Sequence, residues 1–205
     1  MDASNARSYD VPALDEISSF SQSQCPAEGS AEHLRMQPLH HVYMSIIGAL
    51  IWISSCTHPH LCVVTNVLSR FSINPAECHF AALIRVLLYL RKHPNDTLTL
   101  GGTGPDAEVL RIITDASHED GPSLSGVFIV MGMAIIDWIC RRQKSTSRSS
   151  LESEALANAE GAQDGVYKRE LAKEFGVKVT TTDFYTDSDS SIKSVSYTHL
   201  TLPTN

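Results

Sequence analysis

The hydrophobic pattern of this chain changes its period near residue 95, and the change restricts the two sides to different classes of fold. Upstream, apolar residues recur every three or four positions, as in the stripe from Phe80 to Leu90, which is the spacing of a helix. Downstream, short runs rich in β-branched residues are separated by turn residues, as in residues 109–115, 126–131 and 134–140. The sequence therefore predicts an all-helical segment followed by an α/β layer.

The helical segment is predicted to cover residues 39–94. Its best-marked helix begins at Asn74, a favourable N-cap, with Pro75 at the first helical position and Glu77 three residues after the cap. In contrast, residues 1–38 are rich in Ser, Ala, Asp, Glu and Gln and have no sustained apolar period. Because such a segment buries too little surface to offset its ordering entropy, it is expected to be a disordered tail.

The downstream layer, residues 95–194, is predicted to be an α/β fold with a mixed sheet and one flanking helix. Gly132-Met133 separates two apolar runs by the two residues of a tight hairpin. Ser149 and Glu152 fit a capping box, which predicts a helix over residues 151–175 that Gly176 ends. The expected strands cover residues 97–100, 109–115, 126–131, 134–140 and 181–186.

The composition limits the class of protein. Hydrophobic residues make up 42% of the chain and charged residues 19%, close to soluble globular averages, which excludes a wholly disordered or collagen-like chain. The net charge of −7 argues against a generally basic nucleic-acid coat, and five cysteines without a C-x-x-C pair are typical of reduced thiols inside a cell. The longest apolar run, residues 43–56, is shorter than the ~20 residues of a membrane span. A soluble, intracellular protein without a membrane partner is expected.

Three acids stand where a sheet enzyme would place them. Asp115 ends the first long strand, Asp187 ends the last strand, and Glu154 lies in the first turn of the long helix. If that helix packs across the sheet edge, the three carboxylates can converge on hard divalent cations. Two Mg²⁺ ions about 3.5 to 4 Å apart would activate a water and stabilise the leaving oxygen of a phosphodiester. Spacing alone leaves the ordinary alternative open, in which each acid is a solvated residue at the end of an element.

A series of motifs surrounds these acids in a fixed order. The motifs are Ile113-Thr-Asp-Ala-Ser-His118, Ser125-Gly-Val-Phe128, Trp138, the segment 141–157, and Tyr185-Thr-Asp-Ser188. In order and spacing they resemble the ribonuclease H domain of Ty1/copia-type retrotransposon Pol polyproteins. The helical segment is similar to the end of the reverse transcriptase that precedes this domain in the family, through Tyr43-Met-Ser-Ile-Ile-Gly48, Leu68-Ser-Arg-Phe71, Pro75, His79 and residues 85–90. The resemblance spans about residues 40–193.

This resemblance implies a fold, an activity and a set of partners. The fold is a ribonuclease H-like mixed sheet, and Asp115, Glu154 and Asp187 are the catalytic, metal-binding acids that cleave the RNA strand of an RNA/DNA hybrid with Mg²⁺ or Mn²⁺. Nearby basic side chains are expected to contact hybrid phosphates, although they also fit an ordinary exposed loop. These residues are Arg141, Arg142, Lys144 and Arg148. The upstream reverse transcriptase portion of the parent polyprotein is an implied partner.

The chain departs from the family pattern at several points. Ser117 and His118 stand where the family usually has Asp and Trp, and the family's fourth acid has no counterpart. Residues 195–205 match neither the family nor a regular helix, so they are expected to be a sequencing artefact that leaves the ribonuclease H-like domain truncated. An impaired enzyme is therefore expected. The alternative is a catalytically inactive retroelement remnant that at most binds nucleic acid or a protein partner.

Three other patterns have competing interpretations. Cys56, His58, His60 and Cys62 occupy every second position, which offers four zinc ligands but lacks the usual C-x-x-C spacing. Asp187 and Asp189 form the Asp-x-Asp of some glycosyltransferases, without any accompanying nucleotide-sugar framework. Trp138 has apolar neighbours and is interpreted as a core residue rather than a platform for a nucleic-acid base.

Overall fold

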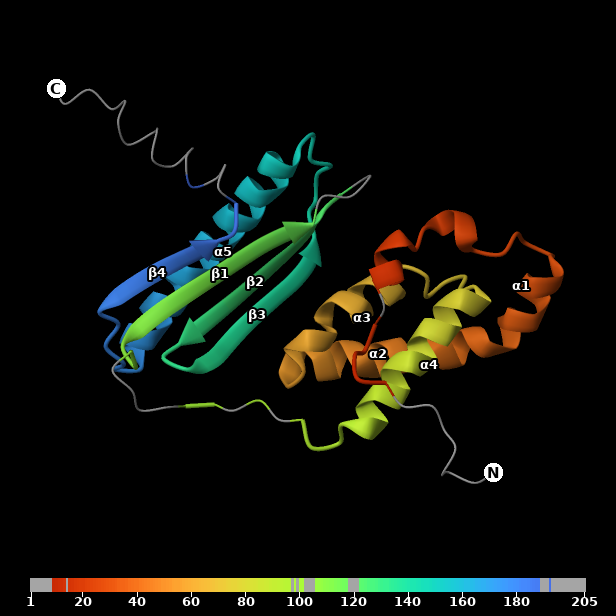
Figure 1. Cartoon of the computed structure of the whole chain (residues 1–205), viewed down its shortest axis with the longest axis horizontal. Helices are drawn as coiled ribbons and strands as arrows, with labels where there is room; N and C mark the ends of the chain where they lie inside the picture. The colour runs from red at the N-terminus through yellow and green to blue at the C-terminus, as the bar shows by residue number, and fades with distance from the viewer. Residues whose placement is uncertain are drawn as a thin grey trace. The chain divides into compact units, whose positions relative to one another are not determined.

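Two units make up the chain, a helical one within residues 1–98 and a mixed α/β one within residues 99–205 (Figure 1). The computed structural model describes residues 9–13, 15–96, 98, 100–101, 106–117, 122–188 and 192. The sequence predicted the change of architecture after residue 94, and the division falls after Leu98.

The helical unit is built around α2, whose stripe of Tyr43, Ile47 and Leu50 faces its core. The Tyr43 hydroxyl, buried with its ring, donates a hydrogen bond of 2.9 Å to the backbone carbonyl of Leu68 in α3. In chain order the described elements are η2 (Asp15–Ser19), η3 (Gln22–Gln24), α1 (Ala31–Met36), η4 (Gln37–Leu39), α2 (His40–Cys56), η5 (Pro59–Leu61), α3 (Cys62–Ser69) and α4 (Glu77–Lys92).

The expectation of a disordered tail is wrong for residues 9–38. Ile17 of η2 is buried in the core of the helical unit, and the Phe20 ring meets the Phe71 ring edge-on with centroids 6.2 Å apart. The apolar residues of this segment are too scattered to show a period, but several of them pack against the core that the later helices form. Residues 1–8 lie outside the described part of the chain.

Helix α4 begins later than its sequence predicts. Its N-cap is Ala76, whose backbone N–H donates a hydrogen bond of 3.0 Å to Nδ1 of His79. The predicted cap, Asn74, instead donates from its side-chain amide to the carbonyl of Pro26 at 3.0 Å. The His79 ring is fully buried and stacks on Phe71 with centroids 3.8 Å apart. A buried side chain therefore caps the start of the helix.

One helical run in the described residues, from Ala31 to Cys56, is long and apolar enough to cross a membrane by length and composition. It includes α1 and η4 and is therefore longer than the apolar run seen in the sequence. A single helix of this kind near an N-terminus is weak evidence for a membrane protein, because core helices of soluble proteins meet the same criteria.

The α/β unit contains a four-stranded mixed sheet in the order β3-β2-β1-β4. Its strands are β1 (Val109–Ser117), β2 (Leu124–Met131), β3 (Ala134–Arg142) and β4 (Thr181–Thr186). β2 pairs antiparallel with β1 and β3, whereas β4 pairs in parallel with β1. Gly132, at φ 60°, makes the predicted turn between β2 and β3. The strand expected at residues 97–100 and the expected tail at 195–205 involve residues outside the described ones.

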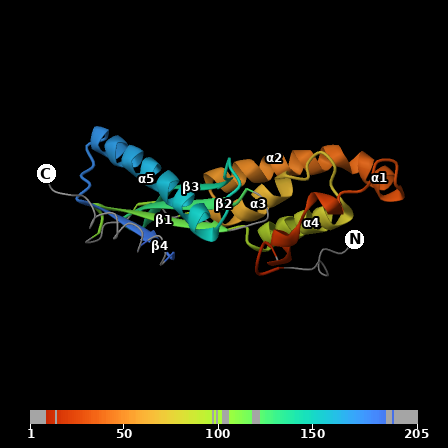
Figure 2. The same ribbon diagram turned by 90° about the horizontal axis from the view of Figure 1, so that it is seen from above.

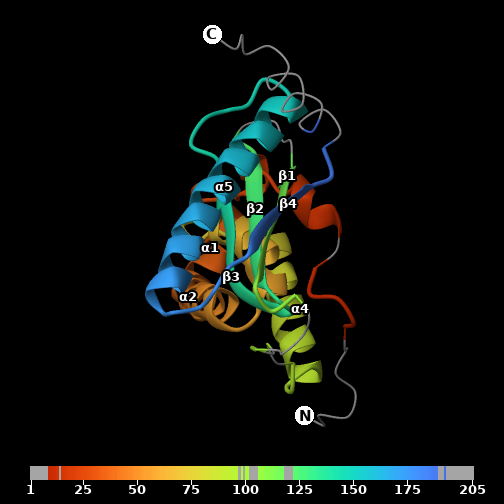
Figure 3. The same cartoon turned by 90° about the vertical axis from the view of Figure 1, so that its left-hand side faces the viewer.

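Helix α5 (Ser150–Glu174) lies along one face of this sheet, chiefly on β1 and β2 (Figures 2 and 3). Its start matches the prediction, since the Ser149 hydroxyl accepts a hydrogen bond of 3.2 Å from the backbone N–H of Glu152. At the other end Gly176 adopts φ 74°, and its N–H donates to the carbonyl of Lys173.

A row of small residues lets α5 approach the sheet closely. Ala157, Gly161 and Gly165 are buried on the face toward β1. A Cβ atom on Gly161 would lie 2.5 Å from Cγ2 of Thr114, which is too close for an undisturbed contact. The backbone of the helix therefore rests almost directly on the strand that carries Asp115.

Candidate metal centre

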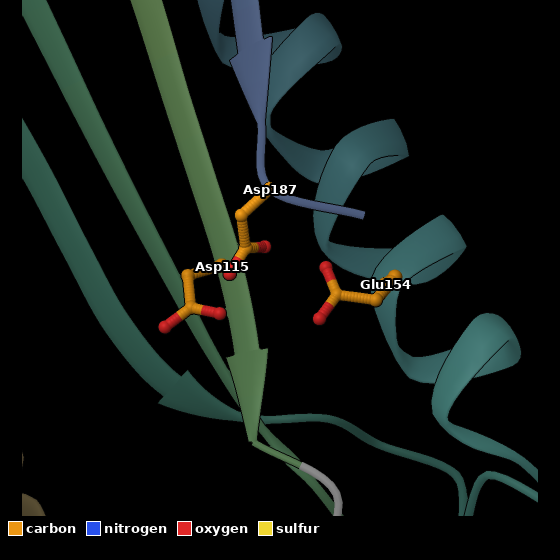
Figure 4. A group of neighbouring side chains, drawn as sticks. All are labelled: Asp115, Glu154 and Asp187. Carbon is orange, nitrogen blue, oxygen red and sulfur yellow. The ribbon is translucent and has the colours of Figure 1, made fainter. Parts of the chain in front are cut away.

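Three carboxylates converge at one edge of the sheet in the α/β unit. Asp115 comes from β1, Asp187 follows directly after β4, and Glu154 comes from the first turns of α5. Figure 4 shows the three side chains extending toward one another from these elements. One carboxylate oxygen from each residue lies within 4.8 Å of those of the other two. The structure therefore brings together all three acids that the sequence singled out.

Strand pairing explains why the acids meet at this place. β4 pairs with β1 only as far as Thr186 opposite Thr114, so β1 has no partner from β4 at Asp115. Asp115 and Asp187 are therefore the first residues beyond the parallel pairing on each strand. Glu154 completes the group because α5 lies so close to β1, and Thr114 donates a hydrogen bond from its hydroxyl to the side chain of Asn158 on α5.

Glu154 is buried, at 7% exposure, whereas the two aspartates are exposed. Burial raises the pKa of the Glu154 carboxyl, and the negative charges of Asp115 and Asp187 raise it further. A hydrogen bond from the backbone N–H of Ala116 opposes this shift and lowers the pKa. The Oε2 atom of Glu154 has no hydrogen-bond partner. A buried oxygen without a partner beside two like charges is an unfavourable arrangement for the protein by itself.

The donor set fits a hard divalent cation. Carboxylate oxygens are the protein ligands that Mg²⁺ and related ions prefer, and a bound cation would offset the repulsion among the three charges. It would also give the unpartnered oxygen of Glu154 a ligand. Among the described residues, this is the group of His, Cys, Asp and Glu side chains close enough together to hold a metal ion.

The basic residues lie at the same end of the sheet as the carboxylates. The strand register aligns Ala116 of β1 with Ser125 of β2 and Ser125 with Arg141 of β3. Since neighbouring strands lie about 4.8 Å apart, the backbone of Arg141 is roughly 10 Å from that of Ala116. The four cations are exposed, but they differ in their partners.

Two of these cations are engaged within the unit. Arg141 forms an ion pair with Glu160 of α5, and Nε of Arg142 donates to the carbonyl of Pro122 at 3.1 Å. Lys144 and the side chain of Arg148 extend from the loop that leads into α5, and only the backbone N–H of Arg148 has a described bond, to Glu152. Lys144 and Arg148 are therefore the two whose charges are most available to a ligand.

The alternating Cys and His residues do not form a zinc site in the structure. His58 and His60 line a cavity of about 220 Å³ together with Tyr89 and Asp96. The thiol of Cys62 instead donates to the carbonyl of Ser54 at 3.3 Å. The four potential ligands therefore do not converge.

The remaining candidates are partly described. Trp138 is half-buried on β3, opposite Phe128 of β2. Asp189, the second acid of the Asp-x-Asp pattern, and His118 lie outside the described residues. Gln143 lies within the matching segment 141–157, but the sequence assigned it no role. Its side chain connects three segments beside the carboxylates.

The chain is similar to polyproteins of plant transposons. It is 30% identical over 154 residues to the retrovirus-related Pol polyprotein from transposon TNT 1-94 of Nicotiana tabacum. The aligned region covers 73% of this chain and 11% of that protein. It is 31% identical over 144 residues to the retrovirus-related Pol polyprotein from transposon RE1 of Arabidopsis thaliana. That region covers 67% of this chain and 10% of that protein. These similarities support a retrotransposon Pol-derived protein.

The chain spans about a tenth of the length of these polyproteins. It also spans most of a shorter relative, the secreted RxLR effector protein 161 of Plasmopara viticola, with 30% identity over 131 residues that cover 61% of this chain and 89% of that protein. No protein-family model matches the chain, and no solved structure matches it significantly.

Proposed function

We propose that the α/β unit is a ribonuclease H-like domain that hydrolyses the RNA strand of RNA/DNA hybrids in a reaction dependent on divalent cations. The observation that carries this proposal is the convergence of Asp115, Glu154 and Asp187, with Glu154 buried and one of its oxygens unpartnered. The similarity to retrovirus-related Pol polyproteins supports it, because the motifs around the three acids resemble the ribonuclease H domain of polyproteins of this kind.

Each acid has a distinct part in this proposal. Asp115 and Asp187 are exposed and hold Mg²⁺, or Mn²⁺ in its place, on the side open to a substrate. Glu154 holds the ion from the buried side, where α5 fixes its backbone. Bound there, divalent cations lower the pKa of an attacking water and stabilise the leaving oxygen of a phosphodiester.

The basic residues orient the hybrid. Lys144 and Arg148 contact phosphates from the loop before α5, while Arg142 contributes from the end of β3. Arg141 is the weakest candidate because its guanidinium already pairs with Glu160. Such contacts set the position of the strand and carry no base specificity. The helical unit is proposed to be the end of a reverse transcriptase, whose upstream portion is its partner.

The test is cleavage of a labelled RNA/DNA hybrid by the purified chain with Mg²⁺ or Mn²⁺. Asp115→Asn, Glu154→Gln and Asp187→Asn should each reduce cleavage at least about 100-fold, since each removes a charged ligand. Glu170→Gln is the matched control, because Glu170 is an exposed acid on the same helix, distant in sequence from the cluster. Its cleavage should equal that of the unchanged chain.

The alternative is a catalytically inactive remnant that binds nucleic acid or a protein partner. It predicts hybrid binding without cleavage in either metal, both for the unchanged chain and for Asp115→Asn. Cleavage that survives all three acid substitutions would contradict the proposed site.

A further inference from the structure

A hydrogen-bonded cluster of buried polar side chains lies beside the carboxylates and has no part in the chemistry proposed above. Its centre is Gln143, the first residue after β3. Four serine side chains surround it, each at most 4% exposed. They are Ser123, Ser125, Ser147 and Ser153.

The side-chain amide of Gln143 joins three segments of the chain. Its Nε2 atom donates to the hydroxyl of Ser125 on β2 at 3.0 Å and to the backbone carbonyl of Ser153 on α5 at 2.8 Å. Its Oε1 atom accepts from the hydroxyl of Ser147 in the intervening loop at 2.8 Å. Both amide protons are used, so the position of this group is fixed from three directions.

Further bonds attach the same turn of α5 to the sheet. The hydroxyls of Ser123 and Ser153 are 3.0 Å apart, and Ser153 also donates to the carbonyl of Ser149 at 3.2 Å. The backbone N–H of Gln143 donates to the carbonyl of Ser123 at 2.8 Å. The residue after Ser153 is Glu154, whose carboxylate joins the metal cluster.

Buried polar networks are unusual at places where apolar side chains could pack equally well. Replacing such groups with apolar side chains often costs little stability, so a polar network that is fully bonded contributes mainly a unique geometry. Here the geometry fixed is that of the helix turn next to Glu154. The small-residue face of α5 sets the distance between helix and sheet, but a smooth face does not by itself set the helix's position along the strands.

We propose that Gln143 is a positioning residue for the carboxylate cluster, holding the first turns of α5 on β2 so that Glu154 stays within reach of a cation shared with Asp115 and Asp187. The inference rests on the proposed metal binding and adds a residue to it. Gln143 touches neither the metal nor the substrate and acts through the backbone of Ser153.

Removing the hydrogen bonds of Gln143 should lower the affinity for the metal ion. This loss should exceed the loss seen in a variant that is destabilised to the same extent elsewhere. Residues that orient metal ligands typically change metal affinity about 10- to 100-fold when they are removed. Gln143→Met keeps the length and volume of the side chain and removes its three hydrogen bonds. Ser125→Ala removes one of those bonds and should give an intermediate effect.

The experiment measures Mn²⁺ binding to the full chain by electron paramagnetic resonance, at a temperature where near-ultraviolet circular dichroism shows every variant folded. Ile129→Val is the stability control, because Ile129 is fully buried on β2 opposite Ile112, away from the cluster. Both variants should lower the melting temperature by a similar amount. Gln143→Met should weaken Mn²⁺ binding at least about 10-fold, while Ile129→Val should leave Mn²⁺ binding unchanged.

Three results would overturn the inference, and they differ in meaning. If the unchanged chain binds Mn²⁺, Asp115→Asn abolishes binding, and Gln143→Met binds as tightly as the unchanged chain, the metal site stands and Gln143 does not position it. If the unchanged chain binds no Mn²⁺, the proposed function and the role of Gln143 fail together. A loss of affinity in Ile129→Val equal to that in Gln143→Met would also refute a specific positioning role.

Discussion

The carboxylate of Glu154 is buried beneath the first turns of α5, and its oxygen lies within 4.8 Å of an oxygen from the exposed carboxylate of Asp115. Two like charges at this separation repel each other, and burial adds to the cost for Glu154. The metal-free protein is therefore less stable at neutral pH than it would be with an uncharged group in this place.

Glu154→Gln is expected to stabilise the metal-free protein while abolishing metal binding. The pKa of Glu154 is raised in the folded state, so the folded chain holds this proton more tightly than the unfolded chain. The stabilising contribution of the proton is present below the unfolded pKa of about 4.5 and is lost as pH rises through the folded pKa. In EDTA at pH 7 the variant should melt a few degrees higher, and the difference should disappear below about pH 4. A lower melting temperature at pH 7 would contradict the electrostatic argument.

The helical unit should lose stability in mild acid through His79. Desolvation lowers the pKa of the buried His79 imidazole from 6.5 to about 4, so the unfolded chain takes up the proton first. Stability is then full above pH 6.5 and falls by roughly 3 kcal/mol as pH decreases to about 4. Urea unfolding at several pH values checks this. His79→Gln should flatten the profile, whereas His41→Gln, at an exposed site on α2, should not; parallel profiles for all three proteins would refute the assignment.

Two glycine substitutions should have opposite effects. Gly161→Ala places a Cβ atom 2.5 Å from Cγ2 of Thr114 and should destabilise the α/β unit by about 1 to 3 kcal/mol. Gly48→Ala meets nothing within 4 Å on α2 and should stabilise the helical unit by about 0.5 to 1 kcal/mol. Denaturant unfolding measures both. Equal stabilisation by the two substitutions would show that α5 does not depend on close contact with β1.

Hybrid binding should depend on salt through the loop cations. Removing one phosphate contact lowers the steepness of the salt dependence by about one unit. We expect this from Lys144→Gln and Arg148→Gln, and a smaller effect from Arg141→Gln because of its pair with Glu160. Lys173→Gln, at the far end of α5, is the control. Fluorescence anisotropy with a labelled hybrid, in EDTA to prevent cleavage, gives the slopes; four identical slopes would exclude this loop as the contact surface.

Periodicity and end signals in the sequence predicted the β2–β3 hairpin, β4 and the length of α5 well. They also placed Asp115, Glu154 and Asp187 at the ends of elements that could share a sheet edge, and the resemblance to ribonuclease H made their convergence an expectation. These features depend on local spacing, which a sequence displays directly.

The features that sequence missed depend on contacts between distant segments. Ile17 is buried because it packs against apolar residues of α2, α3 and α4. The pattern within residues 9–38 does not predict this contact. His79 caps α4 because its ring is held by Phe71, so an apparently ordinary histidine replaced the predicted cap at Asn74. The role of Gln143 was missed for the same reason, since its partners come from three segments.

The parallel pairing of β4 with β1 has a consequence for the order of events during synthesis. β1, β2 and β3 are joined by short connections and can pair as soon as they leave the ribosome, and α5 can then cover them. Asp187 follows β4, which docks beside β1 only after the whole of α5 has been made. A nascent chain can therefore bring Asp115 and Glu154 together before Asp187 is made, and the three carboxylates meet only once β4 has paired with β1.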